Sequence, residues 1–316
     1  MTQNGIMGIG FCSNIRDFRE STLWMVFLAA LAYFSAGCAA HQPSAARPGG
    51  PPLQLRTATK EQVVAAYNEQ ANALESINAS VSMKLTAGTA YSGVIKQYHE
   101  VNGFLLAQRP ARIRVIGQLP VVGTNIFDMA SDGETFHIFV PSKSKFLEGP
   151  TNLQRQSAQP IENLRPQHLI EAVFWTTIPP DAPVLFEAGD ETEARYYILT
   201  VVQQSSGSSN SNSAADWQIA RKVWFERVDM NVARLQIYDS AANVSADVRY
   251  SAWDTFGSVR FARQITLTRP GEDYGLQLGI VKLTVNHPIS ADKFELKQPP
   301  GTELVRVGEE NKESKP

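Results

Sequence analysis

The spacing of apolar residues changes abruptly near residue 75. Before that point, apolar side chains recur at helical intervals, at Val63, Tyr67, Ala71 and Leu74. Thr59 and Gln62 fit a capping box, so we predict a helix that begins there. After it, every second residue is apolar, at Ile77, Ala79, Val81, Met83 and Leu85. This period of two predicts a strand with one buried and one solvated face.

Further strands are predicted along the rest of the chain. Their connections are too short for crossover helices, which indicates antiparallel neighbours. Asp132-Gly133 suits the type I′ turn of a hairpin. The predicted strands are residues 94–107, 111–117, 124–130, 135–140, 143–147, 184–188, 194–203, 217–227, 233–239, 244–252, 259–268 and 274–285.

A second helix is predicted after Pro166, which suits a first helical turn. Leu169, Ile170, Val173 and Phe174 form its apolar face. Two helices and about eleven strands predict a mainly β (α+β) fold. We expect a strongly curved antiparallel sheet that forms an incomplete β-barrel, with helices covering its concave apolar face.

The segments outside this fold have different compositions. Residues 58–301 are predicted as one domain and residues 302–316 as a disordered charged tail. Gln204–Ala215 is rich in Ser, Asn and Gly and predicts an exposed loop. Residues 38–57 include a Pro- and Gly-rich stretch without periodicity, which is typical of a flexible tether.

The N-terminus carries an export pattern. Leu23–Ala36 is apolar and, at about 14 residues, too short to span a bilayer but typical of a signal-peptide core. Ser35-Ala36-Gly37-Cys38 follows and resembles the bacterial lipobox, with Ser35 where that pattern usually has Leu. We therefore predict a lipoprotein signal peptide over residues 1–37 and a lipid on Cys38. An ordinary secretory signal or an uncleaved anchor is the alternative.

Composition and motifs exclude several functions. The 29 Lys and Arg nearly balance the 31 Asp and Glu, so no nucleic-acid partner is expected. Cys12 and Cys38 are the two cysteines, which leaves no disulfide framework after cleavage. The five histidines form no metal-ligand spacing, and no nucleophile elbow or phosphate-binding loop is present. We expect no enzyme activity, catalytic residue, cofactor or metal site.

Three segments carry a family resemblance. Arg109–Val115, Phe127–Gly133 and Asn286–Leu296 are similar to the strand entry, the following hairpin and the closing segment of the LolA/LolB lipoprotein-carrier superfamily. The order of tether, helix, strands, helix and strands also agrees, over about residues 59–301. The resemblance implies an incomplete barrel whose concave face holds acyl chains.

The candidate site residues fall into two groups. Leu119, Pro120, Val121 and Val122 form a connection that is apolar where a turn should be polar. In LolB-like members the equivalent turn presents an apolar side chain to the membrane; the alternative is that this loop folds back onto the core. The expected apolar cavity, for which plain core packing is the alternative, comprises Val81, Met83, Leu85, Phe127, Met129, Phe136, Ile138, Leu169, Val173 and Phe174.

The expected function follows from these features together. We expect a membrane-anchored periplasmic lipoprotein that binds acyl chains or another apolar cargo, with an acceptor role in lipoprotein sorting as its sharpest form. Its partners would be membrane lipid through acylated Cys38, the acyl chains of lipoproteins or other lipids, and a soluble LolA-like carrier. Ala39 after the cysteine resembles signals that permit sorting to the outer membrane of Gram-negative bacteria. The alternatives are a structural or adaptor lipoprotein with a filled core and, third, an enzyme with an unrecognised site.

Overall fold

The structure is a computed structural model, and it describes residues 54–89, 93, 95–152, 163–190, 195–205 and 217–307. The chain divides into two compact units, Met1–Leu53 and Gln54–Pro316, and every described residue belongs to the second. The predicted signal peptide and Cys38 lie outside the described residues, as do residues 206–215 of the predicted loop. Among the described residues, no helix combines the length and apolar character needed to cross a membrane.

Both predicted helices are confirmed. Helix α2 (Lys60–Asn72) begins at the predicted capping box, in which Thr59 and Gln62 each accept a hydrogen bond from the other's backbone N–H. Its Val63, Tyr67 and Ala71 are buried. Helix α4 (Pro166–Val173) has Pro166 in its first turn and buries its apolar face.

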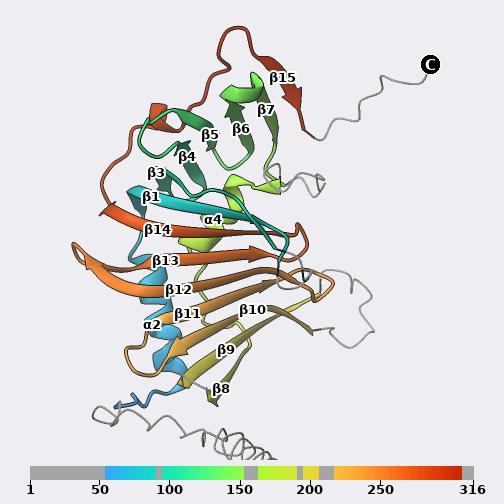
Figure 1. Cartoon of the computed structure of the whole chain (residues 1–316). Coiled ribbons are helices and arrows are strands. Elements are labelled where there is room, and N and C mark those ends of the chain that lie inside the picture. Colours follow the sequence, from blue (N-terminus) through green and yellow to red (C-terminus); the bar gives the residue numbers. More distant parts are fainter. Residues whose placement is uncertain are drawn as a thin grey trace, which may run out of the picture. The chain divides into compact units, whose positions relative to one another are not determined.

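The strands form one sheet with the order β15-β7-β6-β5-β4-β3-β1-β14-β13-β12-β11-β10-β9-β8, and β2 pairs with β1 (Figure 1). Every pairing is antiparallel except that of β15 with β7. In the described residues β15 and β8 are the two edges, so the sheet is not closed. The strands are β1 (Ser76–Ala87), β2 (Lys96–Gln97), β3 (Val101–Gln108), β4 (Arg112–Gln118), β5 (Asn125–Ser131), β6 (Thr135–Val140), β7 (Lys145–Pro150), β8 (Val184–Asp190), β9 (Arg195–Gln204), β10 (Trp217–Glu226), β11 (Val232–Tyr238), β12 (Val244–Phe256), β13 (Val259–Arg269), β14 (Tyr274–Val285) and β15 (Glu303–Arg306).

The prediction of about eleven strands was therefore too low, since the described residues alone form a sheet of fifteen. The predicted strand 94–107 is two strands, because β2 pairs with β1 only at Thr86 and Ala87 before the chain turns into β3. The expected type I′ turn is also wrong. Of its two central residues only Gly133 has a positive φ, of 107°, and the Asp132 carboxylate instead accepts the backbone N–H groups of Glu134 and Thr135.

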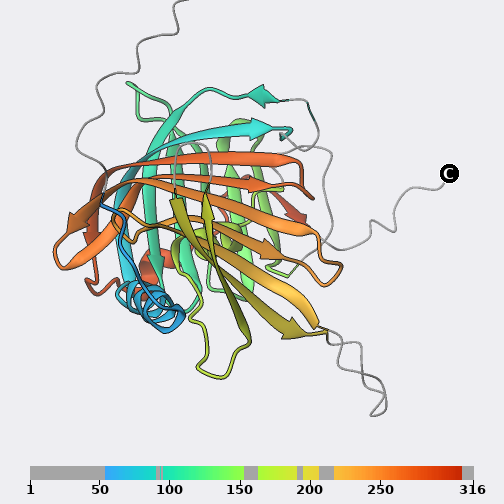
Figure 2. The ribbon, with the colours of Figure 1, turned by 90° about the horizontal axis from the view of Figure 1, so that it is seen from below.

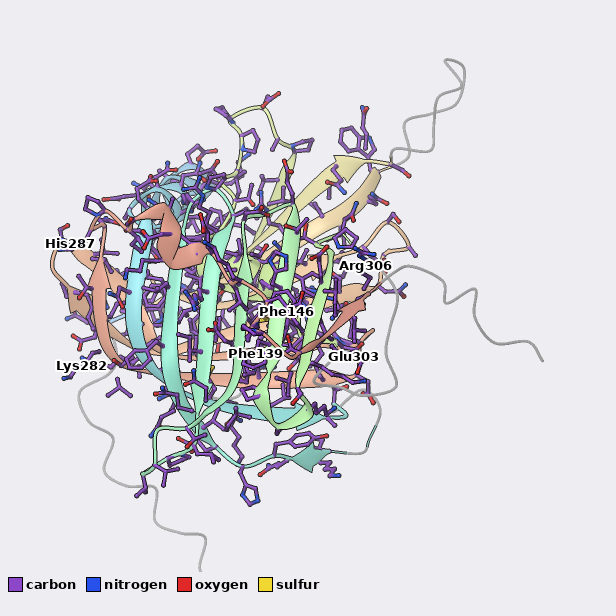
Figure 3. All side chains as sticks on the ribbon, turned by 90° about the horizontal axis from the view of Figure 1, so that it is seen from above. Phe139, Phe146, Lys282, His287, Glu303 and Arg306 are labelled. Carbon is purple, nitrogen blue, oxygen red and sulfur yellow. The ribbon has the colours of Figure 1, made fainter. Side chains whose placement is uncertain are left out.

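Two boundaries of the predicted domain need correction. Residues 303–306 belong to β15 rather than to a disordered tail. The segment after β14 crosses the outer face of the sheet to reach the edge at β7 (Figure 3), and Arg114 donates to the carbonyls of Lys293 and Glu295 on the way. The tether ends before Arg56, whose backbone N–H donates to Arg227 and whose carbonyl accepts from the Tyr197 hydroxyl.

The sheet bends at a β-bulge in β14, where Val281 has no partner in β1. The pairing of β1 with β14 shifts register between Ser80 and Val81, and a bulge increases the local bend and twist of a strand. The strands on either side of β1 therefore turn toward each other around an inner face (Figure 2). Helix α4 lies on that inner face. It packs against β4 and β5, and it is hydrogen-bonded to tyrosines of β12 and β14.

The inner face carries the main hydrophobic core, and this core lies within the second unit. Tyr67 of α2 stacks on Trp175 with ring centroids 5.7 Å apart and meets the edge of Phe225 at 6.2 Å. Helix α2 thereby contacts the core through Tyr67. Because the unit from Gln54 contains this whole core, it has what an independently folding domain needs.

Candidate functional site

The ten predicted cavity residues come together in one apolar cluster. Helix α4 and the residue after it contribute Leu169, Val173 and Phe174, and the strands contribute the other seven. Leu85 and Phe127 are partly exposed. The remaining eight are at most 8% exposed, namely Val81, Met83, Met129, Phe136, Ile138, Leu169, Val173 and Phe174.

The cover over this inner face is uneven along the strands. At the strand ends near α2, the inner-face residues Ile77, Ala107, Ile113 and Phe136 have no exposed surface. At the opposite ends of the same group of strands, inner-face residues are partly exposed in four strands, at Leu85, Val101, Phe127 and Val140. We call these four residues the rim. The inner face is therefore closed at one end and incompletely covered at the rim.

Two paired glycines lie next to the rim. Gly103 of β3 pairs with Gly117 of the neighbouring strand β4. In the same row, Gly103 also pairs with Val81 of β1, and Gly117 pairs with Phe127 of β5. A Cβ on Gly117 would lie 2.3 Å from the Phe127 ring, so this ring packs directly on the glycine. A Cβ on Gly103 would lie 2.8 Å from the Met83 methyl group. A flexible methionine and an aromatic ring thus fill the space that two missing side chains leave.

Helix α4 is fixed at its C-terminal end by a buried tyrosine. The Tyr250 hydroxyl of β12 accepts a hydrogen bond from Trp175 Nε1 at 2.9 Å and donates to the Ala172 carbonyl at 2.8 Å. Burial raises the pKa of Tyr250 far above its usual value, so the hydroxyl keeps its proton. The hydroxyl therefore serves as donor and acceptor at once.

The segment after α4 is fixed by two arginines. Arg109 Nη2 donates to the carbonyls of Ala71 at 2.7 Å and Trp175 at 3.1 Å, which joins the end of α2 to the end of α4. Arg221 donates to the carbonyls of Thr176 at 2.6 Å and Thr177 at 2.9 Å. Charged donors make stronger hydrogen bonds than neutral ones, so the segment after α4 is firmly held.

A charged cluster, absent from the sequence predictions, holds the other side of α4 to the β13–β14 turn. Arg269 makes two hydrogen bonds with Glu272, at 2.8 and 3.2 Å, and one with Glu171 of α4 at 3.3 Å. His168 Nδ1 lies 2.5 Å from the Tyr274 hydroxyl. Burial, Arg269 and Arg165 lower the pKa of His168 well below its usual value, so the ring is neutral at pH 7.

The predicted membrane-contact loop projects from the rim end of the sheet. Leu119 is 46% exposed, Val122 is 69% exposed, Pro120 is exposed and Val121 is fully exposed. The loop therefore does not fold back onto the core. Backbone hydrogen bonds from Leu119 N to the Thr124 carbonyl and from Gly123 N to the Leu119 carbonyl close it.

Val121 has an unusual backbone conformation. Its φ of 76° lies in the left-handed region, which is strained for a β-branched residue. Because the side chain contacts no core, packing does not explain why an apolar residue occupies this position.

The described residues contain no group of three or more His, Cys, Asp or Glu side chains that could hold a metal ion. The charged groups of the cluster around α4 are engaged with one another in the contacts given above. The inner face can therefore bury apolar groups, and the 119–123 loop exposes apolar side chains to its surroundings.

Comparison with known proteins finds similar solved structures at low sequence identity. No family model matches the chain, and no curated protein matches it. Among solved structures, a LolA superfamily protein from Nitrosomonas europaea has a TM-score of 0.45 and 11% identity, covering 76% of this chain and 99% of its own. A DUF1329 family protein from Desulfovibrio piger has a TM-score of 0.45 and 12% identity, covering 73% of this chain and 94% of its own.

A third similar structure, from Vibrio parahaemolyticus, is a domain named for outer membrane lipoprotein sorting. Its TM-score is 0.45 at 10% identity, and the match covers 74% of this chain and 96% of that one. The first structure belongs to the superfamily that the sequence motifs resemble. At such scores the likeness carries no argument about function, so the proposal below rests on the geometry of this chain.

Proposed function

We propose that this protein binds acyl chains or another apolar cargo on the inner face of its sheet, at a membrane surface of the bacterial envelope. One observation carries the proposal. The inner face loses its cover at the rim, and the exposed apolar loop of Leu119, Val121 and Val122 joins two of the same strands, β4 and β5, at the same end. With the apolar inner face and the exposed loop at one end of the sheet, lipid could pass between a membrane that contacts the loop and the inner face.

Side chains already fill most of the inner face, so cargo would have to displace some of them in order to enter. Helix α4 covers the concave face in this proposal and moves to admit the cargo. Each CH₂ group moved from water contributes about 0.8 kcal/mol, so an acyl chain offsets the lost contacts of a short helix. The rim residues, with Phe127 on Gly117, are where the first methylene groups would contact the protein.

The membrane contact would come from the loop and from the N-terminus. Transfer of each fully exposed apolar side chain of the loop into the bilayer contributes about 1.5–3 kcal/mol. We further propose that Cys38 is acylated and anchors the unit on the periplasmic side of the outer membrane. There the protein would accept lipoproteins or other lipids from a soluble LolA-like carrier, with no catalytic role.

Mass spectrometry of extracted lipid tests the cargo. The unit from Gln54 is purified under native conditions and compared with a Leu85→Asp/Phe127→Asp variant, which places charges on the rim. A Leu185→Asp variant is the matched control, because Leu185 is 66% exposed on the edge strand β8. We expect co-purified lipid with the wild type and the control and at least ten-fold less with the rim variant. An absence of lipid from all three would reject the carrier function.

A structural or adaptor role is the second candidate function. The observation in its favour is that eight of the ten expected cavity residues are at most 8% exposed, as in an ordinary core. In that case no lipid co-purifies, and a fluorescent fatty acid leaves the melting temperature unchanged. Labelling with radioactive palmitate, comparing wild type with Cys38→Ala, tests the anchor for both candidates.

A further inference from the structure

A second group of exposed apolar side chains lies at the same end of the sheet as the 119–123 loop. In the connection between β1 and β3, Ile95 is 54% exposed and Tyr98 is 37% exposed. With Leu119, Val121 and Val122 they make up five of the ten large apolar residues that are exposed in the described part of the chain. We call Ile95–Tyr98 the β2 segment.

The β2 segment and the loop are attached to neighbouring strands. Tyr98 N donates to the Leu85 carbonyl at 3.0 Å, and Lys96 pairs with Ala87, so the segment is fixed to the rim end of β1. Gln118, which precedes the loop, pairs with Asn102 at the start of β3. Figure 2 shows β2 and the β4–β5 connection projecting on the same side of the sheet.

The residue types in the β2 segment suit the boundary of a lipid bilayer. Lys96 Nζ lies 5.7 Å from the centre of the Tyr98 ring, in a cation–π contact. Tyrosine places its ring among the upper acyl chains and its hydroxyl in water, and lysine extends its charge to lipid phosphates. The loop from Gln118 to Thr124 carries no charged residue that would oppose insertion.

We propose that the β2 segment is a second membrane-contact element, and that it and the loop together hold the rim against a phospholipid bilayer. This inference rests on the proposed function and names the partner surface. Contact at two separated elements fixes the orientation of the sheet, which a single loop does not do. The rim residues Leu85 and Phe127 then open toward the acyl chains.

Fluorophores at single cysteines test the proposal in the unit from Gln54, which contains no native cysteine. Variants Ile95→Cys, Val121→Cys and Leu185→Cys are labelled with an environment-sensitive dye and mixed with phosphatidylethanolamine–phosphatidylglycerol vesicles. We expect a blue shift and quenching by brominated lipids at positions 95 and 121, and neither at position 185. Insertion at 121 with an unchanged spectrum at 95 would overturn the proposal.

Partitioning into the same vesicles gives a second measurement. Ile95→Asp and Tyr98→Asp should each lower the partition coefficient about ten-fold, and Leu185→Asp should leave it unchanged. Unaltered circular dichroism in each variant confirms the fold.

If lipid still co-purifies with the protein but the β2 segment stays in water, this inference fails and the proposed cargo binding stands. If the segment contacts vesicles but no lipid ever co-purifies, the proposed function fails instead. Contact only with a protein partner also rejects the bilayer as the surface bound.

Discussion

His168 Nδ1 and the Tyr274 hydroxyl lie 2.5 Å apart, and this hydrogen bond joins α4 to β14. The two rings also stack, with centroids 6.0 Å apart. Arg165 and Arg269 are close enough to lower the pKa of His168, and Glu272 lies 3.8 Å from its other ring nitrogen. Helix α4 is therefore attached to the sheet through a neutral imidazole between charged neighbours.

This attachment predicts that acid destabilises the unit. The pKa of His168 is lowered in the folded state, whereas an unfolded histidine has a pKa near 6.5. The stability that depends on the neutral ring is thus fully present above pH 6.5 and is lost as the pH falls toward the folded pKa. We expect the free energy of unfolding to fall below pH 6.5 with a slope approaching about 1.4 kcal/mol per pH unit for this group.

Urea unfolding at several pH values measures the effect, with His168→Gln as the comparison. Glutamine keeps a polar side chain that does not titrate, so the variant should lose this part of the pH dependence. Glu171 and Glu272 face the same cluster and are present in both proteins, so their contribution is common to the two measurements. Equal slopes for the two proteins between pH 5 and pH 6.5 would contradict the assignment to His168.

Removal of Arg109 should separate α2 from the segment after α4. Its guanidinium donates to Leu74, Ala71 and Trp175 carbonyls, and truncation leaves these acceptors without that partner. We expect Arg109→Ala to lower the free energy of unfolding by about 3 kcal/mol, and Arg109→Lys to recover only part of it. Arg112→Ala, on the exposed start of β4, is the control and should change stability little. A similar loss for both alanine variants would refute the specific role.

The two glycines near the rim should differ in their tolerance of a methyl group. A Cβ on Gly103 would lie 2.0 Å from the Ile116 carbonyl oxygen, which is backbone, whereas on Gly117 it would meet only the Phe127 ring. Gly103→Ala should therefore lower stability by more than about 3 kcal/mol, and Gly117→Ala by about 1–3 kcal/mol.

A double-mutant cycle separates the two cases. Gly117→Ala/Phe127→Ala should be more stable than the sum of the single changes predicts, because the clash disappears with the ring. Strict additivity would show that Phe127 does not restrict Gly117. The same cycle with Gly103 should show no such recovery.

How far the sequence predicts this structure depends on what holds each element in place. The inner face of β1 was predicted correctly because its period of two reflects burial of every second side chain. Strand β15 was missed because Glu303–Arg306 is held by backbone pairing with β7 and leaves most side chains exposed. Backbone pairing of this kind does not require alternating apolar residues, so the pattern of apolar residues does not predict it.

The charged cluster was missed for a related reason. His168 and Glu171 belong to α4, while Arg269 ends β13, Glu272 lies in the following turn and Tyr274 begins β14, and no short motif joins them. Folding brings them together around α4. The exposed loop was predicted because apolar residues in a short connection are unusual by themselves.

Val121 should matter for membrane contact and not for stability. Val121→Asn removes the apolar side chain but tolerates the φ of 76°, and Val121→Gly removes the strain as well. We expect the melting temperature of both variants to stay equal to that of wild type or to rise. Their partitioning into vesicles should fall about ten-fold, the effect of one lost apolar side chain. A drop in melting temperature with unchanged partitioning would assign Val121 to the fold.

The hydroxyl of Tyr250 offers a way to loosen α4 without disturbing the core around it. Tyr250→Phe keeps the ring between Trp175 and Trp253 but removes the hydrogen bonds to Trp175 Nε1 and the Ala172 carbonyl. Because both partners then lie buried and unsatisfied, we expect a loss of about 1–3 kcal/mol in the free energy of unfolding.

The same change should speed cargo exchange if α4 moves to admit the cargo. Stopped-flow transfer of a fluorescent fatty acid from the protein to vesicles measures this rate. We expect Tyr250→Phe to transfer several-fold faster than wild type. Tyr238→Phe, which loses a hydrogen bond to Gln236 within β11, serves as the control and should transfer at the wild-type rate. A lower melting temperature for Tyr250→Phe with an unchanged transfer rate would mean that cargo reaches the inner face without displacing α4, through the rim alone.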